Sequence, residues 1–123
     1  MDCACGSGKS YTNCCEPFHL NKENAPTAEA LMRSRYSAFV FQNADYLYET
    51  TDPLKRKGNS RKAYLDSAKN TKWVKLEILF SAADVVEFKA YYLGRNFNIE
   101  ILHEKSNFRQ ENDKWFYVDG TFY

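Results

Sequence analysis

The sequence lacks the features of membrane and secreted proteins. Its 123 residues contain no apolar run that approaches the roughly 20 residues of a membrane span. The N-terminus has neither a basic segment nor an apolar segment, so we expect no signal peptide. The formal net charge of +1 provides no overall field to attract nucleic acid or anionic lipid. We therefore expect a cytoplasmic protein without a membrane partner, and a nucleic-acid partner is disfavoured.

The sequence also lacks the short motifs of common enzymes. It has no G-x-S-x-G nucleophile turn, no phosphate-binding loop and no dinucleotide-binding fingerprint. No reaction is therefore indicated, no catalytic residue is assigned, and a non-enzymatic role is favoured.

Cysteine is absent after Cys15, and all four cysteines lie in the stretch CACGSGKSYTNCC. A reducing cytoplasm argues against disulfides, and the C-x-x-C pattern of redox enzymes is missing. Four thiolates instead suit a tetrahedral metal ion, for which zinc is the default and iron is possible. The spacing predicts a metal-binding knuckle. Its ligands would be Cys3, Cys5, Cys14 and Cys15.

The residues around these cysteines support a metal site. Gly6 and Gly8 allow a tight turn, and Ser7 can add a local hydrogen bond. Lys9 can offset part of the net charge of about −2 that four thiolates leave on a divalent ion. His19 has two interpretations. It is a substitute ligand or, with four cysteines present, more simply a surface histidine.

Apolar residues recur at helical spacing in the next part of the chain, after a polar linker. The pattern predicts three helices, over residues 28–42, after Asn43, and over about 60–69. Thr27 is the expected N-cap of the first helix. Arg35 falls on its apolar side and therefore needs a carboxylate or other hydrogen-bond acceptors. The basic run over 55–62 is expected to be a solvated loop.

From Trp73 onward the hydrophobic period changes to two, which indicates β-strands. The expected strands cover about 73–80, 86–92, 97–108 and 115–119. A change of parity in the third strand predicts a bulge near 101–103. Helices followed by an antiparallel meander predict an α+β fold, with the helices packed on one face of the sheet.

Two sets of residues resemble known families. The segment from Cys3 to Cys15, with the glycines, Lys9 and Tyr11, resembles the SEC-C metal-binding motif that ends the SecA translocation ATPase. Four further segments resemble the YchJ-like family: LMRSRYSAF (31–39), ADYL (44–47), HEKSNF (103–108) and WFYVDG (115–120). The resemblance implies a knuckle over 1–20 and a cone-shaped nuclear transport factor 2-like (NTF2-like) domain with a curved sheet over 27–123. Members of that family often carry a second cysteine motif, which these residues lack.

The cone-shaped fold implies a pocket between the long helix and the sheet. The candidates to line it are Arg35, Tyr36, Tyr46, His103, Trp115, Tyr117 and Asp119. Tyr117 and Asp119 are two residues apart and are expected on one face of a strand. We expect Asp119 to pair with Arg35. A pair between His103 and Asp119, arranged as a general base and its orienting carboxylate, is the alternative.

The knuckle carries the most specific chemistry and therefore directs the functional prediction. We expect a non-catalytic metal-binding adaptor whose knuckle, through Lys9 and Tyr11, contacts a protein or the ribosome. The analogy is the SecA tail, which contacts a secretion chaperone. The alternative is a small-molecule binding protein or enzyme that uses the conical pocket.

Overall fold

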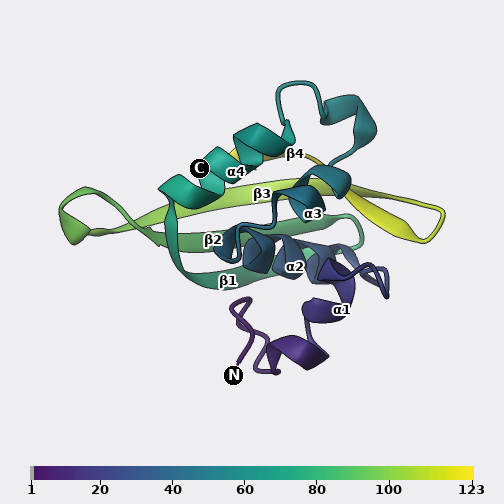
Figure 1. Ribbon diagram of the computed structural model, residues 1–123, viewed down its shortest axis with the longest axis horizontal. Helices are drawn as coiled ribbons and strands as arrows, with labels where there is room; N and C mark the ends of the chain where they lie inside the picture. Colours follow the sequence, from purple (N-terminus) through teal and green to yellow (C-terminus); the bar gives the residue numbers. More distant parts are fainter. Residues whose placement is uncertain (1) are drawn as a thin grey trace.

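Four antiparallel strands and the helices packed on one side of them form two layers (Figure 1). The computed structural model describes residues 2–123. The helices are α1 (Glu16–His19), α2 (Ala28–Val40), α3 (Ala44–Glu49) and α4 (Arg61–Asn70). The strands are β1 (Lys72–Ala82), β2 (Val85–Leu93), β3 (Ile99–Glu111) and β4 (Lys114–Phe122). This order confirms the predicted α+β class.

The helices begin where the sequence predicts. The side chain of Thr27 accepts a hydrogen bond from the backbone N–H of Ala30 at 3.0 Å. Asn43 and Ser60 cap α3 and α4 in the same way. Each cap satisfies a backbone donor that the first helical turn leaves unpaired, which fixes the helix start.

Helix α2 is the central helix of the fold. It contacts β1, β2 and β4 on one side and helices α1, α3 and α4 on others. Leu31 and Tyr36 of α2 are buried with Leu47 of α3 and with Val86 and Phe88 of β2. This buried apolar cluster supplies the main hydrophobic stabilisation of the domain.

The sheet has the order β1-β2-β3-β4, so each strand pairs with its neighbour in sequence. Strands β2 and β3 pair without interruption from Val85–Asn107 to Leu93–Ile99. The bulge predicted near 101–103 is therefore wrong. The register shifts lie elsewhere, twice between β1 and β2 and once between β3 and β4, next to Phe108.

The mistaken bulge has a clear cause in the parity of β3. Glu104 and Ser106 are buried together with Phe108, so the inward positions of this strand include polar residues. Ile99 and Ile101 lie on the outer face and are half exposed. The apolar residues of β3 therefore switch from the outer to the inner face of the sheet along the strand, although the strand is regular.

In the part of the chain that the structure describes, no helix is long and apolar enough to cross a membrane.

Candidate functional site

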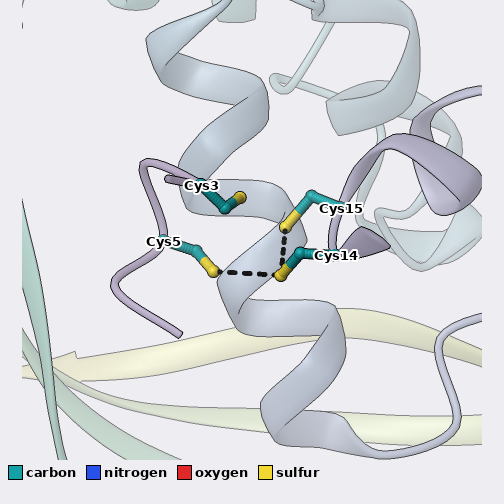
Figure 2. A group of neighbouring side chains, drawn as sticks. All are labelled: Cys3, Cys5, Cys14 and Cys15. Carbon is teal, nitrogen blue, oxygen red and sulfur yellow. Dashed lines mark hydrogen bonds between the residues drawn. The ribbon is translucent and has the colours of Figure 1, made fainter. Parts of the chain in front are cut away.

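The four cysteines converge on one point beside α2, although they come from two separate segments (Figure 2). Cys3 and Cys5 lie in a small loop closed by a bridge between Asp2 and Ser10. Cys14 and Cys15 follow a short 3-10 turn. All four Sγ atoms lie within 4.8 Å of one another.

The sulfur separations fit a single tetrahedral ion. A zinc–thiolate bond of about 2.3 Å places the ligand sulfurs of a tetrahedron about 3.8 Å apart. The Sγ atoms of Cys5 and Cys14 are 3.5 Å apart, and those of Cys14 and Cys15 are 3.8 Å apart. All four cysteines are free thiols. The cluster can therefore hold one metal ion through four sulfurs.

The loop between the ligands has the geometry that its sequence predicts. Gly6 and Gly8 have φ angles of 79° and 86°, in the left-handed region that favours glycine. The backbone N–H of Cys3 donates to the carbonyl of Lys9 at 2.8 Å and closes the loop. The hydroxyl of Ser7 lies 3.1 Å from Cys14 Sγ, where it can donate to a thiolate.

The thiols interact strongly with one another. A hydrogen bond from Cys15 lowers the pKa of Cys5 to about 4. The same interaction and burial raise the pKa of Cys15, and burial raises that of Cys3. Without a cation, the cluster therefore favours one thiolate stabilised by neighbouring thiols. A divalent ion would favour ionisation of the remaining ligands and release protons.

His19 connects this cluster to α2. Its Nε2 lies 2.8 Å from the carbonyl oxygen of Ser34, and its Nδ1 lies 2.8 Å from the hydroxyl of Tyr11. Nε2–H is therefore assigned as the donor to Ser34, and Nδ1 accepts from Tyr11. The expectation of a surface histidine is wrong, because His19 is only 9% exposed. Burial lowers the pKa of His19, which favours this neutral form.

Two other contacts hold the knuckle against α2. Arg33 donates to the carbonyl of Cys5 at 2.7 Å and forms an ion pair with Glu29 at 3.0 Å. The ring of Tyr11 packs against Phe41, with ring centroids 4.8 Å apart. The cysteine cluster is thus joined to the α+β domain through α2 and the residue that follows it.

A cavity of about 420 Å³ lies on the other side of α2, between this helix, α4 and the sheet. Its lining includes Arg35, Tyr36, Tyr64, Trp73, Glu104 and Tyr117. Three of the seven predicted pocket residues are therefore on its wall. They are Arg35, Tyr36 and Tyr117.

The buried guanidinium of Arg35 is held by neutral groups. Its Nη1 donates to the carbonyl of Leu47 at 2.9 Å and to the hydroxyl of Thr50 at 2.7 Å. Its Nη2 lies 3.3 Å from the hydroxyl of Tyr64, and its Cζ lies 4.8 Å from the ring centroid of Tyr117. These contacts compensate for the loss of hydration on burial. The expected pair with Asp119 does not form.

Tyr117 links Arg35 to a buried carboxylate. Its hydroxyl donates to Glu104 Oε2 at 2.8 Å, and the hydroxyl of Ser106 donates to the same oxygen at 2.7 Å. Burial and the neighbouring Glu104 raise the pKa of Tyr117. A Cβ atom on Gly120 would collide with the Glu104 carboxylate, which two hydrogen bonds hold in place, so the strand needs glycine there.

The other four candidates do not line this cavity. Tyr46 bonds to Ser34 on the knuckle side of α2, and Trp115 donates to the carbonyl of Pro26. His103 pairs with Glu87 at 2.7 Å on the outer face of the sheet.

Asp119 lies on the outer face because of a β-bulge. Asn107 is opposite Asp119, whereas Phe108 is opposite Tyr117, so β4 contains one extra residue at this point. The bulge turns Asp119 away from the face that Tyr117 occupies, and Asp119 accepts from Asn107 at 2.9 Å. The proposed pair between His103 and Asp119 is also not formed, since each bonds to another residue.

The sequence prediction missed several residues of the cavity wall. They are Tyr64, Trp73 and Ser106. In the sequence, Glu104 is a candidate beside His103, but it is not predicted to be part of the pocket. The spacing of Glu104 and Ser106 from Leu102 and Phe108 was the available signal, because residues two apart on a regular strand share a face. Sequence alone gave no comparable indication that Tyr64 reaches Arg35 across 29 positions of the chain.

Comparison with known proteins identifies the family to which the chain belongs. A sequence model described as YchJ, middle NTF2-like domain, matches residues 27–120. The chain belongs to the YchJ family. A UPF0225 protein of Vibrio cholerae is 38% identical over 128 residues, covering 99% of this chain and 83% of that protein. A UPF0225 protein of Streptomyces coelicolor is 42% identical, covering 98% of this chain and 94% of its own length.

Two solved structures share the whole architecture. A SEC-C motif containing protein from Rhodopseudomonas palustris superimposes with a TM-score of 0.90 at 34% identity, covering 98% of both chains. A sec-c motif containing protein from Psychrobacter arcticus has a TM-score of 0.81 at 32% identity, covering 98% of this chain and 82% of its own. The YchJ-like resemblance and the NTF2-like fold are confirmed.

The cysteine cluster predicts one metal ion per chain. Native mass spectrometry of the wild type should detect this ion, and Cys14→Ser should lose it because one of the four ligands is removed. Ser7→Ala is the matched control, since it keeps all four thiolates and removes one hydrogen bond to Cys14. It should retain the ion with roughly 10- to 100-fold weaker affinity. Equal metal content in wild type and Cys14→Ser would contradict the assignment of this ligand.

The contacts of Arg35 predict a large loss of stability for one residue of the expected pair and almost none for the other. Arg35→Met leaves buried acceptors without their donor and should lower the free energy of unfolding by about 1–3 kcal/mol. Asp119→Asn should change it by less than about 0.5 kcal/mol, because Asp119 is exposed. Urea denaturation of both variants measures the difference. An equally large loss for Asp119→Asn would contradict this prediction, because it would show that the Asp119 carboxylate stabilises the fold.

Proposed function

We propose that this chain is a non-catalytic, zinc-binding adaptor of the cytoplasm, whose knuckle contacts a protein or ribosomal partner. Four protein ligands leave a tetrahedral ion without an open position for water or substrate. Cys3, Cys5 and Cys15 are buried, which further limits access to the ion. These features favour a structural ion over a catalytic one. Zinc is the proposed ion because it is the usual metal of tetrahedral four-cysteine sites, and iron is the other metal that such a site accepts.

A groove beside the knuckle is the observation that supports a docking role. It has a volume of about 1110 Å³ and separates the knuckle from the start of α2 and the β1–β2 turn. Its charged lining residues are Lys9, Glu29, Arg33, Asp84 and Arg109. A groove formed jointly by knuckle and domain can receive a segment of another protein only while the knuckle stays in place. This gives the metal ion a role in the proposed contact.

Lys9 is the residue of this groove best suited to recognise a partner. Arg33 is paired with Glu29, and Arg109 with Asp52. No carboxylate of residues 2–123 forms an ion pair with Lys9, which is exposed. We propose that Lys9 contacts an acidic group of the partner. Tyr11 does not line the groove. Its half-exposed ring packs against Phe41 and its hydroxyl bonds to His19, so we propose that it supports the knuckle and contributes to the partner contact only at the edge of this surface.

Charge reversal of Lys9 tests this role. Lys9→Glu should lose the partners that the wild type captures from a cytoplasmic extract or a ribosomal fraction, because an attractive charge becomes repulsive. Lys22→Glu is the matched control, since Lys22 is also exposed but does not line the groove. Both variants should keep the wild-type metal content. Identical capture by wild type and Lys9→Glu would reject the proposed contact.

A further inference from the structure

The cavity between α2, α4 and the sheet contains two buried charges that do not pair with each other. Arg35 is 4% exposed and Glu104 is 6% exposed. Within residues 2–123, neither residue takes part in an ion pair. The ring of Tyr117 lies between them, stacked on Arg35 and bonded to Glu104. A buried charge without an opposite partner is unusual unless polar groups or a ligand compensate for it.

Each of these charged groups keeps one atom free for a ligand. Both hydrogen bonds to Glu104 end on Oε2, and the four from Arg35 start at Nη1 and Nη2. Trp73 Nε1 is the only fully covered side-chain nitrogen or oxygen of residues 2–123 that lacks a partner. Glu104 Oε1 and Arg35 Nε are therefore unpartnered but not completely covered, and both residues line the cavity. The cavity thus offers an acceptor and a donor.

The rest of the wall is aromatic. Trp73 packs against Tyr36, Phe39 and Tyr92, with ring centroids 5.5–6.0 Å apart. All four rings line the cavity. Such walls favour a flat aromatic ligand, because rings contact one another best in stacked or edge-to-face arrangements. A cavity of about 420 Å³ is within the range of small-molecule sites, which begins near 300 Å³.

We propose that this cavity binds an uncharged aromatic molecule that carries an amide group. Arg35 and Glu104 are the two residues of opposite formal charge in the lining, and no other lysine, arginine, aspartate or glutamate contributes to it. The wall therefore has no net formal charge, which disfavours an anion or a cation. An amide presents a carbonyl oxygen to the Arg35 donor and an N–H to the Glu104 acceptor. An amide therefore supplies the acceptor and the donor that complement these two groups, without adding charge.

This inference is independent of the adaptor role. The cavity and the groove beside the knuckle lie on different sides of α2 and share no lining residue. Loss of the knuckle partner in a Lys9 variant would leave the ligand site as described here. Failure of ligand binding would likewise leave the knuckle contact untouched.

Three probes with the same ring system test the proposal. They are 2-naphthamide, 2-naphthoate and 2-naphthylmethylamine, which are neutral, anionic and cationic at pH 7. The readout is the indole N–H resonance of Trp73, which lines the cavity, with that of Trp115 in the groove as an internal reference. We expect 2-naphthamide to shift the Trp73 resonance with a Kd at least tenfold lower than either charged probe. The Trp115 resonance should stay in place.

Two comparisons between variants distinguish binding in the cavity from nonspecific binding to the protein surface. Ser67 is exposed and lines the cavity, so Ser67→Phe should obstruct access and raise the Kd of 2-naphthamide at least tenfold. Ser67→Ala should not change it. Glu104→Gln keeps the size and shape of the side chain beside Gly120, but it removes the negative charge that balances Arg35 in the cavity wall. Relative to wild type, it should therefore shift the preference toward 2-naphthoate at least tenfold.

The outcomes that overturn the proposal are distinct. If no probe moves the Trp73 resonance, the cavity is not a site for this class of ligand. If wild type prefers 2-naphthoate or 2-naphthylmethylamine, the inference of an uncharged ligand is wrong. If Ser67→Phe binds 2-naphthamide as tightly as Ser67→Ala, the probe binds elsewhere on the protein.

Discussion

The hydrogen bond from His19 to the carbonyl of Ser34 is the buried contact that fixes the position of the cysteine knuckle on the α+β domain. It attaches the segment after the metal ligands to the middle of α2, and Tyr11 extends the same chain of hydrogen bonds into the knuckle. Both nitrogens of His19 are in use, so its neutral tautomer is fixed by its partners. The knuckle has too few residues to form a hydrophobic core alone, which makes this attachment and the proposed metal ion its expected sources of order.

Helix α2 lies between the cysteine knuckle and the aromatic cavity. Ser34 and Arg33 face the knuckle, where they bond to His19 and to the carbonyl of Cys5. Arg35 and Tyr36 face the cavity, only one or two positions further along the chain. Neighbouring residues of one helix therefore face two different sites, which share no lining residue. The fold thus combines a closed ligand set on one side with an open aromatic cavity on the other.

The sequence was informative where local chemistry determines structure. Cysteine spacing, the glycines between the cysteines and the helix caps Thr27 and Asn43 predicted the corresponding features, because each depends on residues close together in the chain. The errors concern contacts across the sheet. A bulge beside Tyr117 moves Asp119 to the outer face, and buried polar residues at Glu104 and Ser106 hide the inward side of β3. The bulge depends on the partner strand, which sequence periodicity cannot reveal. The two-residue spacing does place Glu104 on the face of Leu102, but a buried carboxylate is tolerated there only because Gly120 leaves room for it.

The most direct test of this account is X-ray absorption spectroscopy at the metal of the purified protein. Four converging Sγ atoms predict a first coordination shell of sulfur alone, with four neighbours at about 2.3 Å for zinc. His19 should be absent from this shell, because both of its nitrogens are bonded elsewhere. A shell that contains nitrogen or oxygen, or fewer than four sulfurs, would contradict the closed four-cysteine centre on which the adaptor proposal rests.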